Sequence, residues 1–192
     1  MAKSREKKLE KMEKIDKPSF TTKPHFRFNC VESTAQVILE VNGLEVGYYY
    51  PLLPKMKFDI RNEEKVVITG FNGIGKSTLL KTIMGEIVPI AGEFKFSETI
   101  KNIGYYEQDL KWENSEDTPL NIISKDFPKL TQKQIRKHLA DCGIKKEHVI
   151  QPITTLSGGE QAKVKLCKLI LKPCNLLILD EPTNHLDADT KE

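Results

Sequence analysis

The sequence lacks any apolar run approaching the roughly 20 residues needed to cross a bilayer. Its N-terminus is charged and no hydrophobic segment follows, so it does not have the pattern of a secretory signal. The four cysteines form no Cys-x-x-Cys pair; they are Cys30, Cys142, Cys167 and Cys174. Scattered thiols favour reduced cysteines over a disulfide framework or a zinc site. We therefore expect a cytoplasmic protein that does not itself insert into a membrane.

The chain also has little net charge, a formal +3 over 192 residues. An excess of this size does not by itself indicate nucleic-acid binding. The charge is uneven, because residues 1–17 hold seven Lys or Arg and four acidic residues. Leu9, Met12 and Ile15 form a thin apolar stripe in this segment, so we expect one exposed helix that ends before Pro18. A solvated charged tail is the alternative.

The remaining composition, 39% hydrophobic and 30% charged, is that of a soluble globular protein. Apolar periodicity and turn residues predict the elements. We expect strands at residues 37–46, 56–60, 65–69, 93–96, 103–106 and 176–179, the first broken by a turn at Asn42-Gly43. We expect helices at residues 75–84 and 158–171, and helical structure over 120–150 with Thr131 as an N-cap. This order of strands and helices implies an α/β core with parallel strands.

A glycine-rich segment lies between the strand predicted at residues 65–69 and the helix that follows. Residues 70–77 read Gly-Phe-Asn-Gly-Ile-Gly-Lys-Ser, which fits the phosphate-loop pattern G-x-x-x-x-G-K-[ST]. Its backbone N–H groups and the helix N-terminus would attract an anion. We expect Lys76 to reach the β- and γ-phosphates of ATP and Ser77 to bind Mg²⁺. The predicted ATP-binding residues here are Gly70, Asn72, Gly73, Gly75, Lys76, Ser77 and Thr78.

The last predicted strand ends in two carboxylates, Asp180 and Glu181. Ligands of open α/β sheets bind beyond the carboxyl ends of the strands. We therefore expect Asp180 to face the phosphate loop and hold Mg²⁺, and Glu181 to polarise the attacking water. Many buried strands end in an acid, so this motif is weak alone. Together with the phosphate loop it is a strong indication of Mg²⁺ and ATP binding.

Residues 156–161 read Leu-Ser-Gly-Gly-Glu-Gln at the start of a predicted helix. Ser157 and Glu160 are spaced as in a capping box, and an ordinary helix start needs no second glycine. The hexapeptide resembles the signature motif of ABC ATPases. The phosphate loop before it and Asp180-Glu181 after it have that family's order and spacing.

This resemblance implies that ATP is held between two ABC domains that face each other head to tail. Ser157, Gly158 and Gly159 would act on the ATP bound to the partner domain. Tyr48 resembles the aromatic residue that stacks on adenine, with packing of the tyrosines against the strands as the alternative. Gln108 matches the glutamine loop, which joins the core to the helical subdomain and senses Mg²⁺ and the γ-phosphate.

Residues 180–187 read Asp-Glu-Pro-Thr-Asn-His-Leu-Asp, and this run resembles the ABC-F branch. The resemblance implies two ATPase domains on one chain, no membrane domain, and a role on the ribosome in translation. Residues 1–24 resemble the end of the charged linker that in this branch reaches toward transfer RNA. Leu186-Asp187 match the loop that contacts the opposite site. The alternative function is the ATP-binding subunit of an ABC membrane transporter.

We therefore expect residues 1–24 to be a helical linker segment and residues 37–192 to be an ABC ATP-binding domain. The expected fold is a parallel core sheet with an antiparallel β subdomain and a helical subdomain at about residues 112–156. The family's switch histidine lies on a later strand, and His185 belongs to the loop after Asp180-Glu181. The expectation is a truncated domain that hydrolyses ATP poorly without a second ABC domain.

Overall fold

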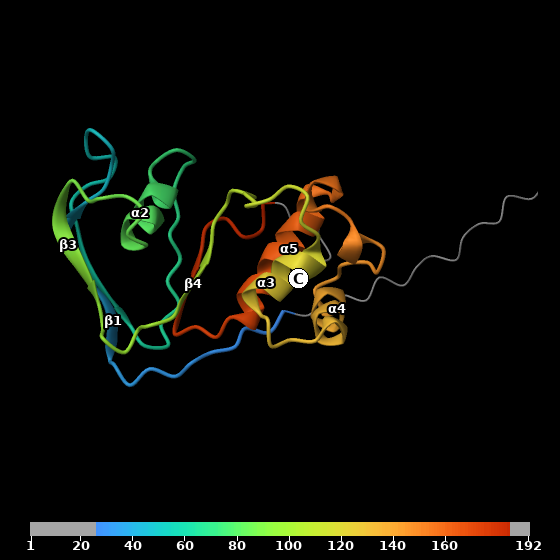
Figure 1. The fold of residues 1–192 in the computed structure, drawn as a ribbon. Coiled ribbons are helices and arrows are strands. Elements are labelled where there is room, and N and C mark those ends of the chain that lie inside the picture. The colour runs from blue at the N-terminus through green and yellow to red at the C-terminus, as the bar shows by residue number, and fades with distance from the viewer. Residues whose placement is uncertain (1–25, 185–192) are drawn as a thin grey trace, which may run out of the picture.

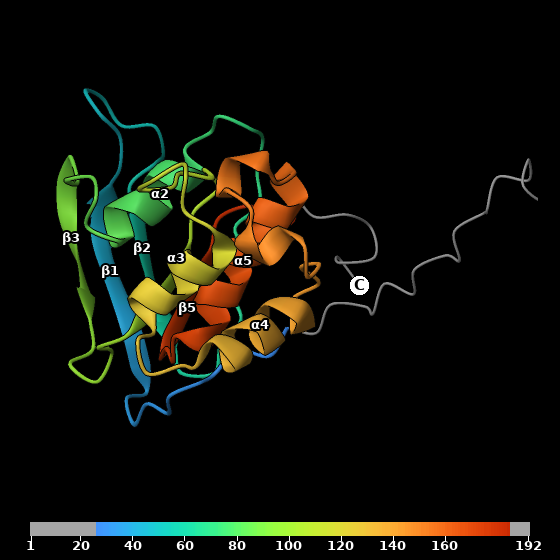
Figure 2. The same ribbon diagram turned by 45° about the vertical axis from the view of Figure 1, so that its right-hand side comes forward.

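The structure is a computed structural model that describes residues 26–184 (Figure 1). An antiparallel sheet and a group of helices lie on opposite sides of the molecule in both views (Figures 1 and 2). Strand β4 (Ile103–Tyr106) lies between them and pairs in parallel with β5 (Leu176–Leu179). The predicted helix at residues 1–17 and the loop at 186–187 lie outside the described residues. Within residues 26–184, no helix is long and apolar enough to span a membrane.

The antiparallel sheet has the strand order β2-β1-β3. Its strands are β1 (Val37–Glu45), β2 (Met56–Arg61) and β3 (Ala91–Phe96). The turn predicted at Asn42-Gly43 is wrong, because β1 continues through it with a shift of register and Gly43 at φ 64°. Both edges of β1 are paired. A bulge absorbs the left-handed glycine while the ladder continues on either side.

Helix α2 (Lys76–Ile83) corresponds to the helix predicted at residues 75–84, and it packs on this sheet. The buried cluster between them comprises Leu39, Val41, Leu44, Val46, Leu79 and Ile83. The helix starts after Gly75, which has a left-handed φ of 114°. It ends in a Schellman arrangement, because Gly85 N–H donates to Thr82 O and Glu86 N–H donates to Lys81 O, both at 2.9 Å. The sheet therefore supports helix α2, and this helix fixes the C-terminal end of the phosphate loop.

The strand predicted at residues 65–69 is wrong, since the structure assigns these residues no strand. Val66, Val67 and Ile68 are 51%, 81% and 42% exposed. β-Branched side chains favour a strand only where a neighbouring strand pairs with it. Among the described residues, β4 and β5 pair only with each other, so neither supplies that neighbour.

The helical part contains α3 (Pro119–Asp126), α4 (Gln132–Asp141), α5 (Gly158–Leu171) and two short 3₁₀ turns, His148–Ile150 and Ile153–Thr155. Its core includes Ile123, Ile135, Leu139, Ile153 and Val164, all fully buried. Thr131 is the N-cap of α4, as predicted. Its Oγ1 accepts from the N–H of Gln134, and Gln134 Oε1 accepts from the N–H of Thr131 at 2.8 Å. The predicted combination of parallel strands, antiparallel sheet and helices is confirmed.

Candidate functional site

The glycine-rich loop at residues 70–77 turns back on itself around one lysine. Lys76 Nζ donates to the carbonyl oxygens of Gly70 at 2.9 Å and Phe71 at 3.0 Å. Gly75 is buried, and a Cβ there would lie 3.3 Å from Leu52 Cβ. The loop is therefore held on one side by its own lysine and on the other by the segment that joins β1 to β2.

The structure brings the end of β5 next to this loop. Ser77 Oγ donates to Asp180 Oδ1 at 3.1 Å, although the two residues are 103 positions apart. Asp180 is only 3% exposed, and its backbone N–H is fixed to Tyr106 O at 2.8 Å. Parallel pairing of β4 with β5 therefore sets where this carboxylate lies.

The second carboxylate oxygen of Asp180, Oδ2, is buried and has no hydrogen-bond partner among the described residues. A buried carboxylate oxygen without a partner is costly, so such an atom calls for a ligand. Mg²⁺ is bound in proteins by one or two carboxylates together with hydroxyls, waters and phosphate oxygens. The hydroxyl of Ser77 and the free oxygen of Asp180 therefore fit a magnesium ion that arrives with a nucleotide.

Burial and the charge of Asp180 both affect the pKa of the neighbouring Tyr105. Burial first, and the charge of Asp180 second, raise the pKa of the Tyr105 hydroxyl well above its ordinary value. Tyr105 Oη is also buried without a hydrogen-bond partner in the described part of the chain. Tyr105 therefore stays neutral beside this carboxylate.

Glu181 follows Asp180 in a left-handed conformation, with φ 47°. Gln108, which follows β4, donates its side-chain amide to Glu181 Oε2 at 3.1 Å. Asn184 Nδ2 donates to the same oxygen. The structure thus brings together Gln108, Asp180 and Glu181 beside Ser77. Their roles in binding and catalysis stay predictions.

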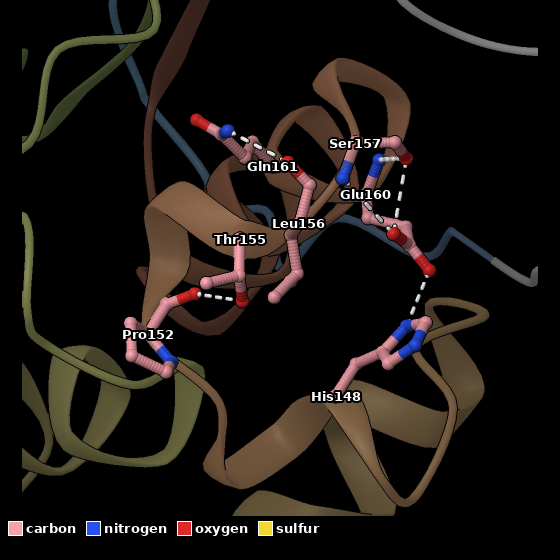
Figure 3. A network of polar contacts seen from close by, with 7 residues as sticks. All are labelled: His148, Pro152, Thr155, Leu156, Ser157, Glu160 and Gln161. Atoms are coloured by element: carbon pink, nitrogen blue, oxygen red, sulfur yellow. Dashed lines mark hydrogen bonds and ion pairs between the residues drawn. The ribbon is translucent and has the colours of Figure 1, made fainter.

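The signature segment starts α5 in the helical part and has a network of its own (Figure 3). Ser157 Oγ accepts from the N–H of Glu160 at 3.3 Å, and Glu160 Oε2 accepts from the N–H of Ser157 at 3.1 Å, so the capping box is present as predicted. Ser157 Oγ also donates to Glu160 Oε2 at 3.0 Å. Figure 3 shows His148 reaching Glu160 from the preceding 3₁₀ turn, and its Nδ1 lies 2.5 Å from Glu160 Oε1.

These contacts set the charge of Glu160. Burial acts to raise the pKa of its carboxyl, but hydrogen bonds from Ser157 and His148 outweigh burial and lower it. Glu160 is thus held ionised beside the exposed Ser157 and Gly158. None of the hydrogen bonds recorded for Ser157 in the described part of the chain reaches the phosphate loop. Within the described residues, the signature segment is therefore not hydrogen-bonded to the phosphate loop of its own chain through Ser157.

Tyr48, Tyr49 and Tyr50 lie in the segment between β1 and β2, and 66%, 98% and 68% of their surfaces are exposed. They do not pack against the strands, which was the alternative to adenine stacking. Leu52 of the same segment lies beside Gly75 of the phosphate loop. Stacking of Tyr48 on adenine stays a prediction.

The sequence did not predict three side chains that form hydrogen bonds with the signature helix or with the segment around Gln108. They are His148, Trp112 and Lys165. Trp112 Nε1 donates to Gln161 Oε1 at 2.8 Å, and Gln161 Nε2 donates to Leu156 O at 3.0 Å. These three residues belong to no motif, and their partners lie 12 to 58 positions away. No local signal in the sequence could have found them.

Comparisons with known proteins agree with this arrangement. A family model described as "ABC transporter" matches residues 53–184. The Bacillus subtilis protein "Uncharacterized ABC transporter ATP-binding protein YfmM" is 45% identical over 192 residues, which is all of this chain and 37% of that protein. "ABC transporter F family member 5" of Arabidopsis thaliana is 35% identical over all of this chain and 28% of its own length. The chain thus spans about a third of these relatives.

Among solved structures, the "Dimeric Structure of MJ0796, a Bacterial ABC Transporter Cassette" has the same fold. Its TM-score is 0.68 at 20% identity, over 80% of this chain and 78% of that one. The match of the family model, the phosphate loop beside Asp180 and the capped signature helix all agree. The chain belongs to the ABC transporter family, the family of ABC ATPase domains.

Proposed function

We propose that this chain binds ATP with Mg²⁺ through residues 70–78. In this proposal Lys76 contacts the phosphates, and Ser77 and Asp180 hold the metal. Gln108 is linked to the same site by its hydrogen bond to Glu181. The observation that carries this proposal is the 3.1 Å contact from Ser77 Oγ to Asp180 Oδ1, beside a buried carboxylate oxygen that has no partner within residues 26–184.

In this proposal Glu181 orients and polarises the water that attacks the γ-phosphate. Phosphoryl transfer depends mainly on positioning and on stabilising charge, and Mg²⁺ supplies much of that charge when it is bound. Gln108 and Asn184 hold one oxygen of Glu181. The fixed carboxylate and the phosphate loop together keep the water in line with the bond that breaks.

A second ABC domain completes the site in this proposal. Ser157, Gly158 and Gly159 would contact the ATP held by that partner. Ser157 and Gly158 are exposed, and among residues 26–184 no hydrogen bond of Ser157 reaches the phosphate loop of its own chain. The dimeric form of the similar bacterial cassette supports this arrangement. ATP would then lie between two domains and close them.

We further propose that the protein is of the ABC-F type and acts on the ribosome in translation, with residues 1–24 as part of its linker. The run at residues 180–187 and the relative named as an F family member support this. Cytoplasmic location follows from the same proposal.

Calorimetry of ATP binding, with and without Mg²⁺, tests the first part. We expect the natural chain to bind and Lys76→Ala to lose tight binding. Lys57→Ala, an exposed lysine of β2, is the matched control and should bind like the natural chain. Unchanged nucleotide affinity in Lys76→Ala would refute the role of the phosphate loop.

Sedimentation with ribosomes tests the second part. The protein with a second ABC domain and Glu181→Gln should trap ATP and sediment with ribosomes only when ATP is present. Equal sedimentation with and without ATP would contradict a role on the ribosome. Instead, ATP-dependent association with a membrane-protein partner would favour the transporter alternative.

A further inference from the structure

Lys165 of α5 points at the backbone on both sides of Gln108. Its Nζ donates to the carbonyl oxygen of Glu107 at 2.7 Å and to that of Asp109 at 2.7 Å. The same ammonium lies 5.2 Å from the centre of the Tyr106 ring, on the last residue of β4. One side chain therefore touches three of the four residues from 106 to 109.

This lysine differs from Lys168 of the same helix. Burial lowers the pKa of Lys165, and Glu107 and Asp109 oppose that shift. By contrast, Lys168, one turn later, is 45% exposed and pairs with Asp126 of α3 at 2.6 Å. Hydrogen bonds from a charged donor are stronger than neutral ones, and here they fix the direction of the two carbonyls that flank Gln108.

Other contacts hold the same segment to the rest of the site. Glu107 Oε1 lies 3.6 Å from Lys81 Nζ of α2, the helix that follows the phosphate loop. Gln108 itself holds Glu181. The residues from 107 to 109 are thus joined to α2, to the end of β5 and, through Lys165, to α5.

We propose that Lys165 is a positioning residue for Gln108. It ties the glutamine segment to the helix whose N-cap is Ser157, so a displacement of α5 is passed to Gln108 and on to Glu181. Lys165 is eight residues from Ser157, about 12 Å along the helix at 1.5 Å per residue. This inference rests on the proposed function for its effect on hydrolysis, but the tie itself is testable without nucleotide.

Hydrogen exchange of the 192-residue chain tests the tie. We expect Lys165→Met to speed exchange at residues 107–112 about tenfold, which is the effect of local opening without global unfolding. Lys165→Arg should restore most of the protection, and Lys168→Met should change nothing in this segment. If Lys165→Met fails to fold, Lys165→Gln replaces it. Equal exchange in the natural chain and in the folded variant would overturn the proposal.

Hydrolysis kinetics with a second ABC domain test the consequence. We expect Lys165→Met to lower kcat roughly tenfold with little change in KM, because the lost positioning acts in the transition state. In a Gln108→Ala background the same substitution should have no further effect, since both act on one group. Additive losses would overturn the positioning role. Failure of the natural chain to bind ATP would count against the proposed function alone and leave the exchange result standing.

Discussion

Gln108 and Glu181 are joined by a 3.1 Å hydrogen bond from the amide of one to Oε2 of the other, across 73 residues of sequence. Asn184 donates to the same oxygen. Both contacts fall on Oε2, so we expect Oε1 to be the oxygen that faces the attacking water. This one-sided arrangement gives the carboxylate a defined orientation.

Glu181→Gln should therefore abolish turnover and spare binding. A glutamine keeps the size of the side chain but cannot take a proton, and loss of a general base costs about 10²- to 10⁴-fold in rate. Phosphate release with a second ABC domain present measures kcat, and calorimetry measures ATP affinity. Glu98→Gln, an exposed carboxylate in the turn after β3, is the matched control. Hydrolysis within about twofold of the natural protein would rule out Glu181 as the base.

Asp180→Asn should remove the effect of Mg²⁺ on ATP affinity. The amide can still accept from Ser77, but it replaces a carboxylate oxygen that is buried and unpartnered within the described residues. Calorimetry with and without Mg²⁺ should give the same affinity for the variant and a clear difference for the natural chain. Asp59→Asn on β2 should retain that difference. A full Mg²⁺ effect in Asp180→Asn would place the metal elsewhere.

Ser157→Ala and Thr131→Ala form a matched pair, because each serine or threonine caps a helix with a capping box. Each substitution should lower the free energy of unfolding by about 1 kcal/mol. Only Ser157→Ala should also slow ATP hydrolysis in the presence of a second ABC domain. Urea unfolding and phosphate release measure the two effects. Equal hydrolysis by both variants would reduce Ser157 to an ordinary cap.

Glu160 should make stability depend on pH in the acid range. Its folded pKa is lowered below the ordinary value of 4.5, so its contribution is present above that value and is lost as pH falls through the lower folded pKa. Glu160→Gln keeps the cap but removes this charge. We expect the natural chain to be the more stable at neutral pH, and the difference to shrink below about pH 4. A constant difference from urea unfolding across this range would contradict the assignment.

Local patterns predicted the elements whose determinants are local. The helix at residues 158–171 and the strand at 176–179 have the predicted bounds, because a capping box starts the first and an apolar run defines the second. Thr131 was identified as an N-cap for the same reason. The turn predicted at Asn42-Gly43 was wrong, since a left-handed glycine fits a turn and a β-bulge equally well. Only the pairing of β1 with its two neighbouring strands shows that this glycine lies in a bulge.

The site residues likewise comprise some that a local motif predicts and others that only the tertiary fold shows. The phosphate loop and Asp180-Glu181 were visible because their spacing is a motif. The contacts of His148 with Glu160 and of Lys165 with the backbone beside Gln108 were not, because each needs the tertiary fold to bring the partners together. The prediction of a strand at residues 65–69 was wrong for a related reason. A strand forms only when a second segment pairs with it, and the local sequence does not show whether such a segment lies beside it.

The exposed apolar side chains at residues 66–68 affect how this chain behaves in solution. Among the described residues no strand pairs with this β-branched segment. Backbone N–H and C=O groups without such a partner can pair with a strand of another chain. We expect the chain at high concentration to self-associate through this segment and to bind dyes that report exposed apolar surface. Val67, at 81% exposed, is the position where a lysine should improve solubility at the least structural cost.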